Sequence, residues 1–270
     1  MNHWTLSSKN IWVAAHRGCS TDYPENTIPA FEAAIAAGVD QIELDVRATL
    51  DGELVVIHDA TVDRTTDGSG KVSEKTLAEI KMLDAGSYKG ARFAGTRIPT
   101  FREFMDLAAK YPTLTVDIEL KEYPTVPGND PRAYEVADAI LAIVEEYGYA
   151  DRVVINSFSN PLNEYVFKKY NGKYRQHVFY PISVMSGTMT IDPYSYAYCA
   201  CMFRGFYNEL NMATRAEFET MEKLGPQPWA GACVKDEAGV DMAIESGAYL
   251  ITCNNPDVIL DLLRKKGYHA

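Results

Sequence analysis

Short hydrophobic runs alternate along this chain with stretches whose apolar residues have helical spacing. The first run, residues 11–15, leads through a loop to Asn26, a plausible N-cap, and then to a helical pattern that stops at Gly38. A strand over 40–46 follows. Strand–helix alternation of this kind predicts a parallel sheet with right-handed crossover connections.

The same alternation continues to the end of the chain and makes close to eight strand–helix units. The strand over 199–203 is the weakest of these predictions, because the periodicity of 181–210 is ambiguous. Barrels of about 250 residues commonly form one domain, and we expect a single domain over 1–270. The other predicted strands are 53–57, 113–120, 152–156, 176–180, 229–234 and 248–252, and the other predicted helices are 101–110, 132–147, 160–170, 215–224, 237–246 and 256–266.

Residues 59–98 break the alternation. Before them, Asp51-Gly52 is a tight-turn signal that leads into the strand 53–57 as in a hairpin. Within them, a polar, glycine-containing loop precedes a short helix opened by the capping box Thr76-x-x-Glu79. Two further capping boxes, Thr100-x-x-Glu103 and Thr214-x-x-Glu217, open predicted helices beyond this segment. We expect a small insertion that folds over the barrel mouth and adds no strand to the barrel.

Charged and ionisable residues gather where the hydrophobic runs end. Active sites of parallel barrels are built from such residues at the ends of several strands. The candidates are His16, Arg17, Glu43, Asp45, His58, Glu119 and Lys121.

The three carboxylates among these candidates indicate a metal site. Glu43 and Asp45 are two residues apart, so both point to the same face of a strand, where two carboxylates repel unless a cation relieves the cost. Glu119 supplies a third oxygen ligand. An all-carboxylate set favours Mg²⁺ or Ca²⁺ over Zn²⁺. The alternative is a solvated outward pair, against which the apolar flanks argue.

Histidine, arginine and lysine at the same strand ends suit a phosphate ester. His16 and His58 can exchange protons near neutral pH, and the Arg17 guanidinium matches phosphate oxygens. Lys121 shares the strand face of Glu119. By contrast, the remaining histidines read as satisfied or solvated residues: His3, His177 and His269.

The composition of the chain narrows the range of possible binding partners. The formal net charge is −11 and no Lys/Arg-rich run is present, which argues against nucleic acid and stable association with anionic membranes. Five cysteines at irregular spacing do not make a disulfide framework, and Cys199-x-Cys201 reads as core. With no signal-peptide pattern and no apolar span of about 20 residues, we expect a cytoplasmic protein. The oligomeric state is left open.

An ordered set of motifs carries a resemblance to a known family. The chain resembles the glycerophosphodiester phosphodiesterase family, densely over about the first 120 residues and more weakly beyond. The motifs are His16-Arg17-Gly18, Pro24-Glu25-Asn26-Thr27, Glu43-Leu44-Asp45-Val46, Asp51-Gly52, residues 55–59, Asp63-Arg64-Thr65-Thr66, residues 83–86, Ile118-Glu119-Leu120-Lys121, residues 155–158 and residues 251–257.

The resemblance implies a TIM (β/α)₈ barrel with a small insertion after the strand ending at His58. It implies hydrolysis of glycerophosphodiesters to glycerol 3-phosphate and an alcohol with one divalent cation, Mg²⁺ or Ca²⁺. The family's roles fall on Glu43, Asp45 and Glu119 as metal ligands, His16 and His58 as the acid–base pair, and Arg17 and Lys121 as phosphate ligands. By analogy with related barrel phospholipases, His16 is the base and His58 the acid, through a cyclic phosphate intermediate.

One departure concerns the substrate pocket. Where family members often carry Trp-Thr-Val-Asn, this chain has Ala232-Cys233-Val234-Lys235. Phe158, Tyr180, Trp229 and Asn254 lie near predicted strand ends and are candidate pocket-lining residues. The alcohol released stays open. So do three rivals: a glycosidase on the same barrel, a lysophospholipase D-like or other phosphodiester hydrolase, and a non-catalytic binding barrel.

Overall fold

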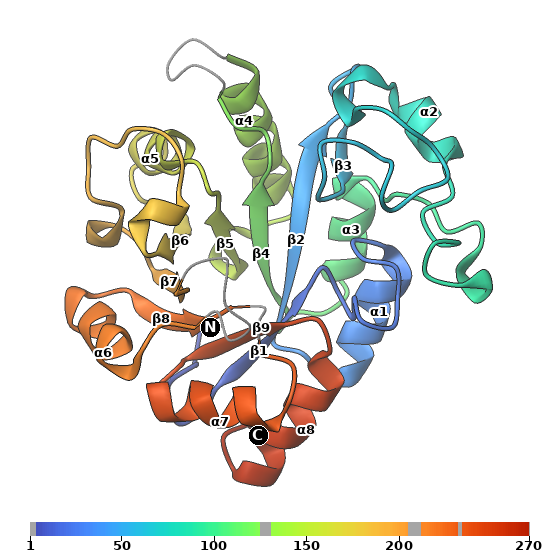
Figure 1. Cartoon of the computed structure of the whole chain (residues 1–270). Coiled ribbons are helices and arrows are strands. Elements are labelled where there is room, and N and C mark those ends of the chain that lie inside the picture. Colours follow the sequence, from blue (N-terminus) through green and yellow to red (C-terminus); the bar gives the residue numbers. More distant parts are fainter. Residues whose placement is uncertain (1–3, 125–130, 205–211, 232–233, 270) are drawn as a thin grey trace.

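The computed structural model describes residues 4–124, 131–204, 212–231 and 234–269. Eight parallel strands form a closed barrel, because β1 pairs with both β9 and β2 (Figure 1). This is the TIM barrel that the resemblance implies. Its strands are β1 Trp12–His16, β2 Gln41–Ala48, β4 Thr115–Leu120, β5 Val153–Asn156, β6 Arg175–Tyr180, β7 Cys199–Met202, β8 Gln227–Ala230 and β9 Leu250–Cys253.

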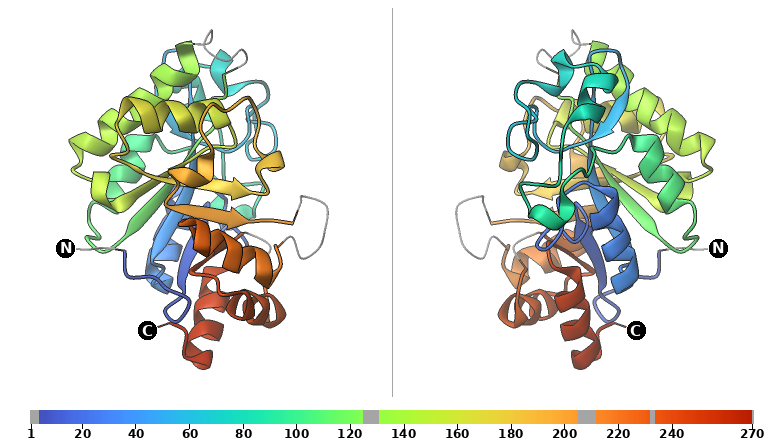
Figure 2. Two further views of the ribbon diagram at one scale, coloured as in Figure 1. Left: turned by 90° about the vertical axis from the view of Figure 1, so that its left-hand side faces the viewer. Right: turned by 90° about the vertical axis from the view of Figure 1, so that its right-hand side faces the viewer.

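Helices surround the ring of strands (Figure 2). The sequence predicted the capping boxes of α2, α3 and α6, and all three form. In residues 181–198, all of which are described, two short 3₁₀ helices stand where an α-helix follows most other strands. The α-helices are α1 Ile28–Ala37, α2 Leu77–Met82, α3 Phe101–Ala108, α4 Pro131–Glu146, α5 Asn160–Lys169, α6 Arg215–Leu224, α7 Glu237–Ser246 and α8 Pro256–Lys266.

The segment 59–98 contributes no strand to the barrel, as expected. The strand before it, β3 Leu54–Val56, pairs antiparallel with β2 outside the ring, which agrees with the hairpin signal. The segment has its own small hydrophobic cluster, and it reaches the loop after β1: Lys89 donates to the carbonyl of Ser20. These contacts tether the segment to a loop of the barrel face, and its covering of the mouth stays a prediction.

Two hydrophobic layers hold the barrel together. The larger lies between the strands and the helices. The smaller fills the barrel interior, where Trp4, Trp12 and Trp229 pack with small and branched residues. Because alternate residues of a strand face opposite sides, the outward residues build the first layer and the inward ones the second. Aromatic rings therefore close one end of the barrel interior, and polar residues line the other end.

Two sequence predictions are wrong in detail. Thr27, not Asn26, is the N-cap of α1. The strand predicted over 229–234 is observed as Gln227–Ala230, and the next residue, Gly231, packs so closely on the ring of Phe203 that a Cβ there would lie 2.5 Å from it. Ala232 and Cys233, part of the departure from the family pattern, lie outside the described residues. Among the described helices, none is long and apolar enough to cross a membrane.

Candidate active site

A cavity of about 320 Å³ opens at the carboxyl ends of the strands. Six of the seven candidates named from the sequence line it, and the seventh, Asp45, is fully buried directly beside them. The lining candidates are His16, Arg17, Glu43, His58, Glu119 and Lys121. The barrel therefore brings together residues that are far apart in the sequence.

The three carboxylates form one cluster. Asp45 and Glu119 are register partners on β2 and β4, and Glu43 lies two residues before Asp45 on the same inward face. One oxygen from each of the three lies within 4.8 Å of the others. Burial, together with the charge of Asp45, raises the pKa of Glu43 well above its usual value, and burial also raises the pKa of Glu119. The negative charges of the three carboxylates therefore repel one another.

Two basic side chains offset part of this charge. The Lys121 ammonium lies 2.5 Å from a Glu119 oxygen and 3.2 Å from Asp45 Oδ1, and Arg17 Nε lies 3.2 Å from Asp45 Oδ2. Although burial opposes both shifts, these ion pairs lower the pKa of Asp45 and raise that of Lys121. Lys121, expected to bind phosphate, here contacts the carboxylates directly.

The loop after β1 holds Arg17 in an uncommon backbone conformation. Its φ is +60°, a region that is sparsely populated by residues other than glycine and costs of order 1–3 kcal/mol. Gly18 follows with φ +80°, and a Cβ there would approach the backbone of Ala30 to 2.6 Å. This close turn directs the Arg17 backbone N–H to Glu43, at 3.1 Å, and its guanidinium to Asp45 and Glu25.

His16 is held by an amide. Its Nδ1 lies 2.6 Å from Asn254 Oδ1, which can only accept, so Nδ1 carries the proton. The other ring nitrogen, Nε2, lies 3.9 Å from Glu43. Burial, followed by the charge of Arg17, lowers the pKa of His16 to about 4. The ring is therefore neutral at pH 7, with Nε2 able to accept a proton.

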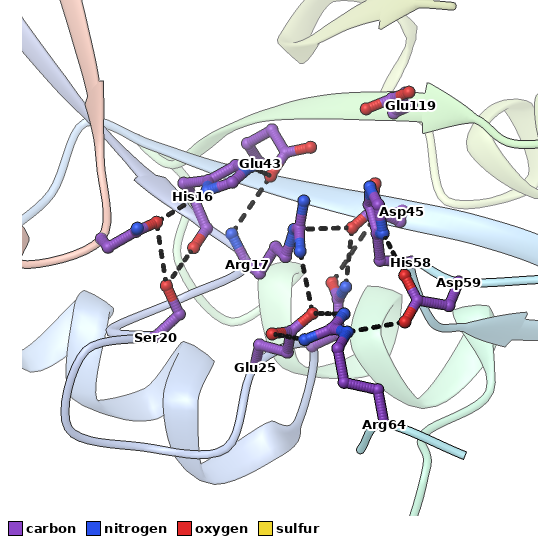
Figure 3. Close-up of polar contacts among 12 residues, drawn as sticks. His16, Arg17, Ser20, Glu25, Glu43, Asp45, His58, Asp59, Arg64 and Glu119 are labelled. Atoms are coloured by element: carbon purple, nitrogen blue, oxygen red, sulfur yellow. Dashed lines mark hydrogen bonds and ion pairs between the residues drawn. The ribbon is translucent and has the colours of Figure 1, made fainter. Parts of the chain in front are cut away.

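His58 is held by a carboxylate, and this carboxylate belongs to a network that the sequence did not reveal. Figure 3 shows Asp59 between His58 and Arg64: His58 Nδ1 lies 2.6 Å from Asp59, which accepts from Arg64 Nε. Arg64 also donates two bonds of 2.7 Å to Glu25. The residue before Arg64, Asp63, accepts from the backbone N–H of Gly70. Burial lowers the pKa of His58, while Asp59 opposes that shift.

Asn26 is a site residue that the N-cap prediction concealed. Its φ is +56°, and its Nδ2 donates to Asp45 Oδ2 at 2.7 Å. Asparagine tolerates the left-handed region better than most residues, so it can turn its amide toward the barrel there. The motif Pro24-Glu25-Asn26-Thr27 was the available signal, because two of its members contact the buried charges.

Two of the four candidate pocket-lining residues are part of the site, and two are not. Phe158 lines the cavity and stacks on Phe179 with ring centroids 3.8 Å apart. Asn254 contacts His16 as described. Tyr180 does not line the cavity, because its hydroxyl points outward and donates to Glu217 of α6. Trp229 does not either, since it is fully buried in the interior cluster.

The remaining histidines were read as satisfied or solvated, and the structure divides them. His269 contacts Asp40 at 2.9 Å, and His3 lies outside the described residues. His177 is buried, lines the cavity and contacts Asp117 through one nitrogen only. The four described cysteines are buried and free, as the core interpretation of Cys199 and Cys201 requires.

A closed parallel barrel with histidines, an arginine and buried carboxylates at the carboxyl ends of its strands defines a barrel enzyme for an anionic substrate. The family model described as "Glycerophosphoryl diester phosphodiesterase family" matches residues 16–199, more than half of the chain. The chain belongs to this family. It is thus a phosphodiesterase, and its family hydrolyses glycerophosphodiesters.

Individual relatives agree. A glycerophosphodiester phosphodiesterase from Caldanaerobacter subterraneus subsp. tengcongensis is 37% identical over 94% of this chain and 98% of that protein. The crystal structure of such an enzyme from Agrobacterium tumefaciens is 26% identical, covers 92% of this chain and 98% of that one, and has a TM-score of 0.72. A phosphodiesterase from Oleispira antarctica, 22% identical over 94% and 96% with a TM-score of 0.77, shares the fold.

Proposed function

We propose that this chain hydrolyses glycerophosphodiesters to glycerol 3-phosphate and an alcohol, with one divalent cation, through a cyclic phosphate intermediate. The observation that carries the proposal is the cluster of three buried carboxylates flanked by two histidines with different partners. His16 is bound by a neutral amide and His58 by a carboxylate. That difference suits one ring to remove a proton and the other to donate one.

The donor set fits a hard cation. Its oxygens converge within 4.8 Å, and Asp45 Oδ1 is buried without a hydrogen bond although the Lys121 ammonium lies nearby. Burial and the neighbouring carboxylates raise the pKa values of Glu43 and Glu119, and a cation at these oxygens would stabilise their charged forms. Glu43, Asp45 and Glu119 would hold Mg²⁺ or Ca²⁺, which when bound would act as a Lewis acid toward a phosphoryl oxygen.

Arg17 and Lys121 supply the remaining positive charge for the phosphate. Both line the cavity, and the Arg17 guanidinium is oriented by Asp45 and Glu25. A guanidinium held in this way offers its other N–H groups to phosphate oxygens, where negative charge grows during the reaction.

The two histidines then move the protons. His16, neutral and with Nε2 free to accept, removes the proton from the glycerol hydroxyl next to the ester, and this oxygen attacks phosphorus. His58, whose protonated form Asp59 stabilises, donates its proton to the leaving alcohol. In the second step water opens the cyclic phosphate with the two roles reversed.

The test is release of glycerol 3-phosphate from a panel of glycerophosphodiesters that differ in the alcohol. The panel contains the choline, ethanolamine, inositol, glycerol and serine esters, each assayed with and without chelator. We expect release that chelator abolishes and that Mg²⁺ or Ca²⁺ restores. Full activity in chelator would refute the metal, and cleavage of lysophospholipids without any cleavage of the panel would favour the lysophospholipase D-like alternative.

A further inference from the structure

Two buried side chains, each with one unpaired polar atom, lie side by side in the wall of the cavity. Asn156 on β5 and His177 on β6 are register partners, and both line the cavity. Their exposed fractions are only 2% and 4%. Both contact the same carboxylate: His177 Nδ1 lies 2.7 Å from one oxygen of Asp117, and Asn156 Nδ2 donates to the other.

The carboxylate determines how these two side chains are oriented. Asn156 presents its NH₂ group to Asp117, and the Nδ1 side of the His177 ring faces the same carboxylate. The opposite ends, Asn156 Oδ1, which accepts hydrogen bonds, and His177 Nε2, are then left for other partners. Both are buried, and neither has a hydrogen-bond partner among the described residues. Two neighbouring buried polar atoms of this kind call for a hydrogen-bonding partner.

The imidazole of His177 is held in place against the interior cluster. Its ring packs on Phe179 and Trp229, with centroid distances of 4.9 and 5.1 Å. Trp229 belongs to the interior cluster, and the strand register places Asn156 beside Glu119 and Asp117 beside Glu43. His177 and Asn156 therefore adjoin both the carboxylate cluster and the closed barrel interior, in the same cavity that holds His16 and His58.

We propose that His177 and Asn156 form a hydroxyl subsite that hydrogen-bonds the terminal hydroxyl of the substrate's glycerol moiety, a group that can donate one hydrogen bond and accept others. This inference rests on the proposed function. Glycerol is the part common to all the substrates and the alcohol is the part that varies, so the enclosed end suits glycerol. In-line attack places the leaving alcohol on the opposite side of phosphorus, toward the open mouth. Asp117 is a positioning residue that holds both side chains.

A purely structural role for the same contacts makes a different prediction. If the Asp117 contacts served only the packing of the barrel, loss of His177 would lower the turnover of all substrates by the same factor. A hydroxyl subsite instead predicts that loss of His177 lowers the turnover mainly of substrates that carry the terminal hydroxyl.

The experiment compares two substrates and three proteins. The substrates are glycerophosphocholine and its analogue with propane-1,2-diol in place of glycerol, which keeps the attacking hydroxyl and lacks the terminal one. The proteins are the parent, His177→Phe, whose flat ring keeps the contacts with Phe179 and Trp229, and the control Gln41→Leu. Gln41 is a fully buried polar residue of the same barrel interior that does not line the cavity. Release of choline gives kcat and KM for each pair, and thermal melts report folding.

We expect the parent to prefer glycerophosphocholine in kcat/KM by at least about 10-fold, because the analogue leaves buried polar atoms unpaired. The kcat/KM of His177→Phe should fall mainly for glycerophosphocholine, so that this variant loses most of the preference. Gln41→Leu should keep the preference. A parent without the preference, or a folded His177→Phe that keeps it, would overturn the subsite. If His177→Phe does not fold, His177→Gln, which retains a hydrogen-bonding group, should keep the preference, and its loss there would count against the subsite. A parent that cleaves neither substrate nor any other glycerophosphodiester would overturn the proposed function itself.

Discussion

Replacing Lys121 by methionine should show how much the Lys121 ammonium stabilises the carboxylate cluster and whether a divalent cation can take its place. The Lys121 ammonium is 6% exposed and contacts both Glu119 and Asp45. Removal of one partner from a buried ion pair costs roughly 3–5 kcal/mol. Because the pKa of Glu119 is already raised, that carboxyl can take up a proton in the variant, and we expect the lower end, about 3 kcal/mol.

The measurement is a thermal melt in chelator at pH 7. For a chain of this size 1 kcal/mol moves Tm by roughly 2–4 °C, so Lys121→Met should melt roughly 6–12 °C below the parent. The control is Lys173→Met, which removes an ammonium that is half exposed and 2.6 Å from Glu145. Exposed pairs contribute about 0–1 kcal/mol, so the control should melt close to the parent.

Added Mg²⁺ or Ca²⁺ then tests the cluster as a cation site. The ammonium and a divalent cation compete for the same oxygens of Asp45 and Glu119, so the metal should raise Tm more in Lys121→Met than in the parent. The reasoning would be refuted if Lys121→Met melted like Lys173→Met in chelator. It would be refuted equally if the metal-induced rise were the same in the variant and the parent.

Three further outcomes follow from the site and its surroundings. His16→Ala and His58→Ala should each lower kcat by about 10²–10⁴-fold, and the double variant should lose much less than the product, because the pair acts as one relay; additive losses in steady-state assays would contradict this. Asp59→Asn should lower kcat more than it raises KM, since it removes the charge that favours protonated His58; an unchanged kcat would contradict that role. Hydrogen bonds from Lys168 and Thr190 outweigh burial and lower the pKa of Glu164 to about 2. This carboxylate should therefore stabilise the fold above its unfolded pKa near 4.3. That contribution, about 3 kcal/mol at most, disappears as pH falls through about 2, so chemical denaturation should show the deficit of Glu164→Gln shrinking between about pH 5 and 2; a deficit independent of pH would count against the ion pair.

The sequence by itself determined which elements form and which side chains share a face. Hydrophobic periodicity located the barrel strands, and the capping boxes located the starts of three helices. The period of two along a strand was enough to place Glu43 beside Asp45, and Glu119 on the face of Lys121. Local rules sufficed for these features because each depends on residues only a few positions apart.

The tertiary structure alone decided which inward-facing residues become neighbours. Barrel closure and strand register place Asp117, Asn156 and His177 together from three strands, and no local spacing encodes that register. The left-handed backbone conformation of Asn26 directs its amide to Asp45, and Asn26 does not cap the helix. Depth in the barrel likewise separates Trp229, which packs in the interior, from Phe158, which lines the cavity. In each case the physical cause is a contact between distant segments, whose geometry exists only once the barrel has closed.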